Sequence, residues 1–218
     1  MIDAASLDVL HHDESIAVLV KPSGLLSIPG RGPDKQDCVS SRLRMSFPHC
    51  IEQPSVHRLD MATSGVMVYA LTAGAHRHLS IQFQDRTVSK QYTAVLDGVP
   101  TGMCEGLKGE IQLKFRLDPD NRPFQVYDPV QGKLGITHWQ CLHVERERAR
   151  IRFTPITGRT HQLRIHAAHE RGFGCPIAGD ALYGRRESAD RLLLHADFLE
   201  FTHPDHGKTM RFFSPAPF

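Results

Sequence analysis

The chain has 218 residues, of which 40% are hydrophobic and 23% are charged, and its formal net charge is +2. This composition is typical of a globular protein and excludes a disordered chain, and no run approaches the ~18 apolar residues needed to cross a bilayer. Residues 1–6 lack the basic segment and apolar core of a signal peptide, so we expect a cytoplasmic protein with no membrane association. Because the net charge is near neutral, nucleic-acid binding would require positive charge concentrated on one face.

The predicted elements, in chain order, are mostly strands. β-branched runs, or alternation of polar and apolar residues, predict strands at 16–20, 66–71, 92–96, 109–117, 136–144, 149–154, 192–201 and 208–213. Apolar residues spaced four apart predict helices at 37–47 and 73–86, and 160–171 reads as a third helix ended by Gly172. The pattern predicts an α+β fold around a large mixed sheet. We expect a single domain over 1–218, with about fifteen residues before its first strand.

The segment His57-Arg58-Leu59-Asp60 is the most informative in the chain, because small residues follow it and lead into the apolar run 66–71. It places one carboxylate and one guanidinium in a tight loop held by a buried strand, where catalytic groups are often found. A single Asp in this setting indicates a nucleophile or a base, with Arg58 close enough in sequence to act at the same site. An ordinary turn, with Asp60 capping backbone groups and Arg58 in solvent, explains the spacing equally well.

The cysteines and histidines do not form a metal-binding pattern. The five cysteines are scattered and include no Cys-x-x-Cys pair, which argues against a zinc ribbon or a redox motif. The fourteen histidines include no His-Glu-x-x-His motif. We therefore expect neither a metal nor a cofactor.

Several segments of the chain match a known set of motifs in a fixed order. They read VKPSGLLSIPG at 20–30, SVHRLDMATSG at 55–65, KQY at 90–92, PITGRTHQLRIH at 155–166, PIAGD at 176–180 and LLLHA at 192–196. Together they resemble the RluA-type family of RNA pseudouridine synthases, in which Asn is usual in place of Val20. The resemblance implies the pseudouridine synthase fold, a mostly antiparallel sheet in two halves with flanking helices and a central cleft.

The resemblance also implies the partner. The branch that the chain resembles most, the dual-specificity RluA branch, modifies uridines in 23S rRNA and in the tRNA anticodon stem-loop, so structured RNA is the expected substrate. Many relatives carry an N-terminal RNA-binding module, which we expect to be absent here, and we expect a monomer. Segment 133–137 departs from the family's usual KPAxT sequence, which bears on the choice of RNA site and not on the chemistry.

Individual roles follow from the resemblance. Asp60 corresponds to the nucleophilic aspartate, Arg164 to the cation that keeps it ionised, and Tyr92 to an aromatic residue that stacks on a flipped uracil or moves its C5 proton. Arg58 resembles the arginine that replaces the extruded base in the RNA. The other residues predicted to contact the substrate are His57, Thr63, Arg159 and Leu194. Sequence does not distinguish attack of Asp60 on ribose C1′ from removal of the 2′ proton.

Other interpretations of these residues remain open. Without the motif, Arg164 would be a helix-surface charge and Tyr92 a sheet-surface tyrosine, and Leu194 fits a core position nearly as well. His57 fits a residue that holds the loop by hydrogen bonding better than an acid or a base. Arginines at 146, 148, 150 and 152 would share one face of a strand, as phosphate contacts or as part of a solvated hairpin diluted by glutamates.

Three other classes of protein share single features with this sequence. A phosphotransferase of the haloacid-dehalogenase type has its strand before the aspartate, whereas here the strand follows Asp60. A glycosidase needs a second carboxylate as general acid, and none is obvious near Asp60. A non-catalytic RNA-binding module of the same fold is the remaining alternative, although it would not need Asp60, Tyr92 and Arg164 together.

Overall fold

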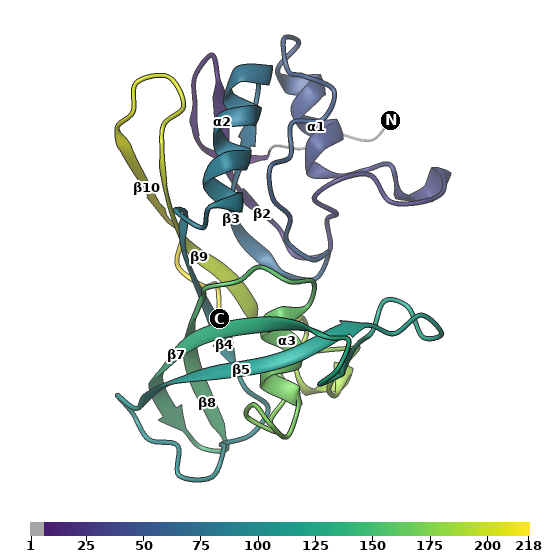
Figure 1. Cartoon of the computed structure of the whole chain (residues 1–218), viewed down its shortest axis with the longest axis vertical. Helices are drawn as coiled ribbons and strands as arrows, with labels where there is room; N and C mark the ends of the chain where they lie inside the picture. Colours follow the sequence, from purple (N-terminus) through teal and green to yellow (C-terminus); the bar gives the residue numbers. More distant parts are fainter. Residues whose placement is uncertain (1–6) are drawn as a thin grey trace. The chain divides into compact units, whose positions relative to one another are not determined.

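The computed structural model describes residues 7–218 and shows an α+β fold (Figure 1). The described residues form ten strands that belong to one sheet. The strands are β1 (Asp8–His12), β2 (Ile16–Lys21), β3 (Ser64–Ala70), β4 (Ser89–Val95), β5 (Lys108–Leu117), β6 (Gln125–Tyr127), β7 (Lys133–Glu145), β8 (Arg148–Pro155), β9 (Leu194–Thr202) and β10 (Thr209–Phe213). The helices are α1 (Val39–Ser46), α2 (Ala73–Gln84) and α3 (Gln162–Ala168), with short 3₁₀ turns at Pro33–Lys35 and Arg186–Ser188.

The chain divides into two compact units. The first unit comprises residues 1–90 and 196–217, and the second comprises residues 91–195 together with Phe218. The chain passes between the units within β4, after Lys90, and within β9, after His195. The division agrees with the predicted two-part sheet, whereas the single domain over 1–218 stays a prediction.

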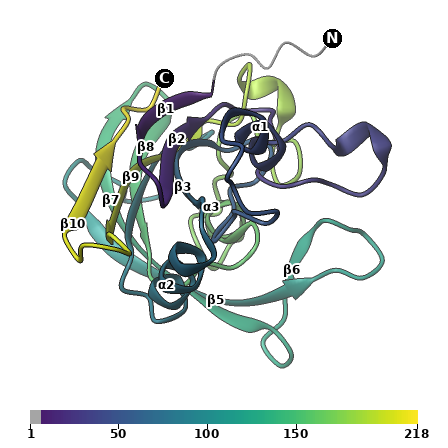
Figure 2. The ribbon, with the colours of Figure 1, turned by 90° about the horizontal axis from the view of Figure 1, so that it is seen from above.

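In the first unit the strands are hydrogen-bonded in the order β1, β2, β3 and β9, with β10 pairing with β9. Strands β2 and β3 are antiparallel and almost wholly buried, as their apolar sequences require. Helix α2 runs alongside β3 in both views (Figures 1 and 2). Its residues Ala75 and Leu79 pack against Val66 and Val68 in the core of this unit.

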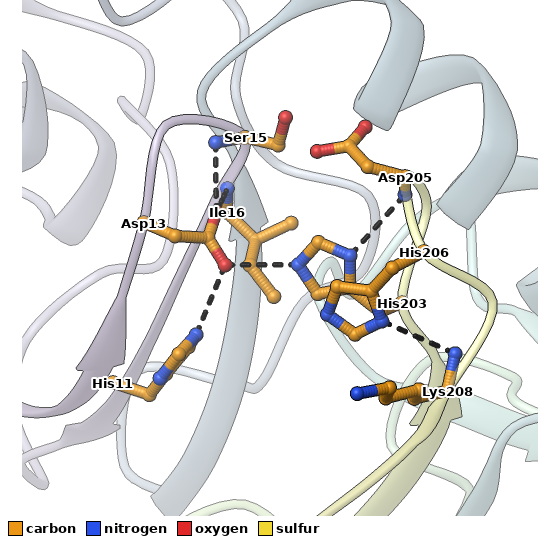
Figure 3. Close-up of polar contacts among 8 residues, drawn as sticks. All are labelled: His11, Asp13, Ser15, Ile16, His203, Asp205, His206 and Lys208. Carbon is orange, nitrogen blue, oxygen red and sulfur yellow. Dashed lines mark hydrogen bonds and ion pairs between the residues drawn. The ribbon is translucent and has the colours of Figure 1, made fainter.

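Asp13 ties the β1–β2 turn to the β9–β10 turn of the same unit (Figure 3). Its carboxylate accepts hydrogen bonds from Nε2 of His203 at 2.8 Å, from Nε2 of His11 at 3.0 Å, and from two backbone N–H groups of its own turn. The buried His203 ring stacks on His206, with centroids 3.8 Å apart. Burial alone would raise the pKa of Asp13, but these hydrogen bonds outweigh it and lower the pKa well below its ordinary value.

In the second unit the strand order is β4, β8, β7, β5 and β6. The long strands β7 and β8 form an antiparallel hairpin around the two-residue turn Arg146-Glu147. Strand β5 alternates exposed and buried residues, as its sequence predicts, and its buried Leu113 and Phe115 pack against Ile165 of α3. Helix α3 is thereby held against the sheet.

The structure corrects some of the predicted elements. The helix expected at 160–171 spans only Gln162–Ala168, because His161 has a left-handed backbone (φ 56°) and His169 is extended. The expected first strand at residue 16 is preceded by β1, whose polar, half-exposed residues hide the strand pattern. The three-residue β6 was also missed. The other predicted strands and helices are present within a few residues of their expected ends.

No helix within residues 7–218 has the length and apolar content that a bilayer crossing needs. The signal-peptide prediction concerns residues 1–6, which lie outside the described part of the chain.

Candidate active site

Asp60 begins a tight turn directly before β3. Its carbonyl accepts a hydrogen bond from the N–H of Thr63 at 3.1 Å, and Asp at this first position is favoured in such turns. Every residue of β3 is buried, so the strand that follows anchors the loop in the core. Asp60 itself is half-buried and Arg58 is exposed, whereas Leu59 between them is buried. The loop therefore keeps both charged side chains out of the core.

The loop after β2 holds this turn through its backbone carbonyls. The carbonyl of Met61 accepts from the Gly24 N–H at 2.8 Å and from Lys21 Nζ at 3.0 Å. The carbonyl of Ala62 accepts from the Ser23 hydroxyl at 2.6 Å. The residue after Asp60 and the one following it are thus fixed by three separate donors.

Ser27 holds the other side of Asp60. Its hydroxyl donates to the Leu59 carbonyl at 2.7 Å and accepts from the Leu59 N–H at 3.1 Å. The carbonyl of Ser27 in turn accepts from the hydroxyls of Ser40 and of the buried Tyr69. The backbone on both sides of Asp60 is therefore immobilised by the segment 21–27.

The ammonium of Lys21 is fully buried, which is costly unless its donors are satisfied. Besides Met61, its Nζ donates to the carbonyls of Pro22 at 2.8 Å and Leu25 at 2.7 Å. One cation thus gathers three carbonyls from two loops. We refer to Lys21, Ser23, Gly24 and Ser27 as the Lys21 clamp.

Gly65 and His57 fix the loop against the sheet. Gly65 has φ +128°, and a Cβ there would lie 2.2 Å from the Ala196 carbonyl of β9, so only glycine fits. Nε2 of His57 accepts from the Val68 N–H at 3.2 Å, and the ring stacks on Phe83 with centroids 4.5 Å apart. Burial, and to a lesser extent the charge of Lys90, lowers the pKa of His57 to about 3. A neutral, anchored imidazole matches the loop-holding interpretation.

In the second unit, Arg164 is buried in α3 and forms a two-pronged ion pair with Asp180. Its Nε donates to Oδ2 at 2.8 Å and its Nη2 donates to Oδ1 at 2.6 Å. The same carboxylate accepts from the N–H groups of Leu182 and Tyr183. Burial alone would raise the pKa of Asp180, but these bonds outweigh it and lower the pKa. The geometry excludes the interpretation of Arg164 as a helix-surface charge.

Tyr183 lies beside this ion pair and also contacts His161. The Arg164 guanidinium lies over the Tyr183 ring, 5.3 Å from its centroid. The Tyr183 hydroxyl accepts from the Gln125 N–H at 2.8 Å and shares a hydrogen bond with Nδ1 of His161 at 2.9 Å. These hydrogen bonds hold the Tyr183 ring against which the Arg164 guanidinium packs.

The turn before α3 is closed by a network around Gln162. Its Oε1 accepts from the Thr157 hydroxyl and the Arg159 N–H, and its Nε2 donates to Ile136 and Thr137. The segment 133–137, where the sequence departs from the family pattern, therefore supports the start of α3. The Arg159 side chain is exposed.

Residues 15–169 match the family described as RNA pseudouridylate synthase. The chain belongs to this family. It is 44% identical over 216 residues to the "Dual-specificity RNA pseudouridine synthase RluA" of Escherichia coli (strain K12), covering 97% of this chain and 94% of the relative. It is 41% identical, with the same coverage, to the protein of that name from Haemophilus influenzae.

Solved structures give the same fold. "Human RNA Pseudouridylate Synthase Domain Containing 1" superposes with a TM-score of 0.77 at 25% identity, covering 99% of this chain and 86% of that one. "Human RNA Pseudouridylate Synthase Domain Containing 4" gives a TM-score of 0.71 at 25% identity, covering 96% and 88%. The predicted fold and the predicted RNA pseudouridine synthase activity are thereby confirmed.

The predicted site residues of this synthase divide between the units. His57, Arg58, Asp60 and Thr63 lie in one loop of the first unit, and Tyr92, Arg159, Arg164 and Leu194 lie in the second. Thr63 and Leu194 are buried, and Tyr92 is half-buried on β4 opposite Phe153. The pairing of Arg164 with Asp60, and each residue's contact with RNA, stay predictions.

Sequence reasoning missed the residues that hold these groups. Asp180 was recognised only as part of a motif. A buried arginine such as Arg164 needs a carboxylate partner, but the sequence does not show which carboxylate that is. Lys21 and Ser27 lie in the matched segment 20–30, and Tyr183 follows Asp180 closely, but nothing in their spacing indicates which loops they join. Within residues 7–218 no group of three or more His, Cys, Asp or Glu side chains is arranged to hold a metal ion.

Proposed function

We propose that this synthase modifies uridines in 23S rRNA and in a tRNA anticodon stem-loop, with Asp60 as the reactive carboxylate. The observation that carries the proposal is the clamped loop, in which donors of segment 21–27 fix the backbone on both sides of Asp60. A rigid backbone is what positioning of a nucleophile requires. The two RNA targets are supported by high-coverage similarity to relatives named as dual-specificity enzymes.

The isomerisation of uridine to pseudouridine requires one carboxylate and involves no oxidation or reduction. As the C1′–N1 bond of uridine breaks, its electron pair leaves with the uracil. The Asp60 carboxylate then either forms a bond to C1′ or removes the 2′ proton to give a glycal. The uracil turns, and C5 bonds to C1′ with release of the carboxylate or return of the proton. The C5 proton is then lost to solvent and N1 takes up a proton, so that the product is an isomer of uridine.

The second unit contributes the cation and the aromatic ring to this proposal. Arg164 keeps the Asp60 carboxylate ionised, and Asp180 fixes the plane of its guanidinium. Tyr92 stacks on the uracil or moves the C5 proton, and Leu194 lines the uracil site. Arg159, with Thr63 and His57 of the first unit, completes the set of substrate contacts in this proposal.

Arg58 takes the place of the flipped base in the RNA. Its guanidinium is exposed, and within the described residues no side chain or backbone group bonds to it. A planar cation with five donors suits stacking and hydrogen bonding between bases. We further propose that the enzyme acts as a monomer in the cytoplasm, where both RNAs are found.

The test is tritium release from RNA labelled at uridine C5. We expect release from both a 23S rRNA fragment and an anticodon stem-loop, and loss of the same pseudouridines in cells that lack the protein. Release from one RNA only would reject the second target. Binding without any release would favour the non-catalytic RNA-binding module.

Two variants test the assigned roles. Tyr92→Phe removes the hydroxyl but keeps the ring, so retained turnover would reject the proton transfer and leave stacking intact. Arg58→Lys keeps the positive charge but loses the planar guanidinium group, and we expect weaker turnover on structured RNA with an unchanged fold. Wild-type turnover by this variant on such RNA would reject the role of Arg58.

A further inference from the structure

An open pocket of about 580 Å³ in the second unit is lined by charged residues that have no role in the proposed reaction. It lies where β4 has ended, at the turn between β7 and β8 and at the loop before the 3₁₀ turn Arg186–Ser188. Its charged lining residues are Asp97, Arg146, Glu147, Arg148 and Arg185. Asp97 follows Tyr92 by five residues of extended chain, roughly 16 Å, so the pocket is separate from the predicted uracil contact.

Asp97 organises two of the three arginines. Its side chain is only 7% exposed, and its Oδ2 accepts from Arg185 Nε at 3.0 Å and Nη2 at 2.9 Å. Its Oδ1 lies 3.7 Å from Nη2 of Arg148, which also donates to the Ser188 carbonyl. One buried carboxylate therefore orients two guanidinium groups, each of which has five N–H donors. Donors remain on both groups for a ligand.

Arg146 is placed at a position that disfavours it. It has φ +54° in the two-residue hairpin turn, where Gly or Asn fits without steric cost. Its side chain is exposed, and within residues 7–218 it forms no hydrogen bond or ion pair. The fold therefore gives no reason for an arginine here, whereas a ligand in the pocket would.

The charge of the pocket matches a single monoanion. Three arginines against Asp97 and Glu147 leave a formal charge of +1, which one phosphodiester group would neutralise. Arg is also the residue best suited to paired hydrogen bonds with phosphate oxygens. By contrast Arg150, on the same strand, donates to the Phe218 carbonyl and lies over its ring. The alternating arginines of the sequence thus have separate roles.

We propose that this pocket binds one backbone phosphate of the RNA substrate at a point remote from the target uridine. The inference rests on the proposed function for the identity of the RNA. Phosphate contacts position a nucleic acid without reading its bases, so the pocket would contribute affinity and register for either RNA. It would not contribute to the chemical step.

The test measures binding of the labelled anticodon stem-loop between about 50 and 200 mM salt. Arg146→Asn removes the charge and leaves a residue that tolerates the turn, and Arg185→Gln keeps a donor to Asp97. We expect each to weaken binding about three- to tenfold, and to lower the slope of log affinity against log salt by about 0.7–0.9, the value for one phosphate. Because both contact the same phosphate, the double variant should lower the slope no further.

Lys108→Ala, which removes one exposed charge elsewhere in the unit, is the matched control. If both arginine variants changed affinity and slope no more than Lys108→Ala, the proposal would be overturned. The single-turnover rate at saturating RNA should stay at the wild-type value, and a lowered rate would also reject a purely positioning role. Because binding is measured without turnover, a protein that failed to isomerise uridine would reject the proposed function and leave this test intact.

Discussion

The two units hold their functional groups in different ways. In the first unit, the backbone around Asp60 is fixed by the Lys21 clamp, which donates to three carbonyls of the loop and accepts from the N–H of Leu59. In the second unit, Arg164 is fixed by one fully buried ion pair with Asp180. The first arrangement positions a side chain through its backbone, and the second positions it directly.

The difference has an energetic consequence. Loss of one neutral donor from the clamp removes a contribution of about 1 kcal/mol and leaves the other bonds in place. Loss of the Asp180 carboxylate breaks a buried ion pair with two charge-assisted hydrogen bonds, which costs several times more. Stability should therefore be far more sensitive to a change at Arg164–Asp180 than to a change at Ser23 or Ser27.

The largest effect is expected for Asp180→Asn. It removes the carboxylate that accepts two hydrogen bonds from the buried Arg164 guanidinium, and we expect the free energy of unfolding to fall by about 3–5 kcal/mol in urea denaturation. Asp128→Asn is the matched control, since Asp128 pairs with the more exposed Arg116 in the same unit and its loss should lower the free energy of unfolding far less. Equal losses for the two variants would show that the buried pair is not special.

Lys21→Met should follow. It leaves the carbonyls of Pro22, Leu25 and Met61 without this donor. Because the variant no longer buries a charged group, part of this loss is offset, and we expect the free energy of unfolding to fall by about 3 kcal/mol. Turnover should fall mainly through kcat, because the loop that carries Asp60 loses its position. Lys208→Met, at an exposed lysine of the same unit, should leave both quantities unchanged. A normal kcat in the Lys21 variant would mean that the clamp does not position Asp60.

His166 lies two residues after Arg164 in α3 and is also buried, but it has no charged partner among the described residues. Its buried ring nitrogens have no hydrogen-bond partner within the described residues, and burial lowers its pKa to about 4. Between pH 4 and the unfolded value of about 6.5 the unfolded chain binds the extra proton, so stability rises with pH and is lost as the pH falls. We expect His166→Leu to reduce the change in the free energy of unfolding over this pH range by about 2–3 kcal/mol.

The measurement for His166 is urea denaturation of both proteins from pH 4 to pH 7. A slope remains in the variant because the pKa of His57 is lowered as well, to about 3. Identical pH profiles for the two proteins would contradict the assignment. His166→Leu should also be no less stable than the wild type at pH 7, because two unsatisfied polar atoms are removed.

Asp13→Asn should have the smallest effect, about 1 kcal/mol, because the contact of Asp13 with His203 is partly exposed. The pKa of Asp13 is lowered in the fold, so its contribution is present above the unfolded value of about 3.8 and is lost as the pH falls through the lowered pKa. Hydrogen exchange should show faster opening of the β9–β10 hairpin. Asp205→Asn is the control, since only the backbone N–H of Asp205 bonds to His203. Unchanged exchange in the Asp13 variant would reject the tie between the turns.

The sequence predicted most elements because their patterns are local. The apolar runs of β2 and β3 and the alternation of β5 are visible in single segments. The edge strand β1 was missed because polar residues such as His11 and His12 form it, and the end of α3 was missed because His161 takes a left-handed backbone. Neither β1 nor the end of α3 has a hydrophobic pattern that could be recognised in a short segment of the sequence.

The candidate site was predictable only in part, for a related reason. Motifs indicated Asp60, Arg164 and Tyr92, but the residues that hold them come from distant segments. Lys21 reaches Met61 across forty positions and Asp180 reaches Arg164 across sixteen. Such contacts depend on the register of paired strands and on loop paths, which spacing in the chain does not encode.

All of the proposed chemistry depends on the carboxylate of Asp60. The most direct test is single-turnover tritium release by Asp60→Asn, which keeps the size of the side chain. It is measured at saturating RNA, with thermal unfolding followed in parallel. We expect a variant that folds and binds RNA like the wild type and releases at least about a thousandfold less tritium. Release within tenfold of the wild-type rate by the folded variant would contradict this expectation.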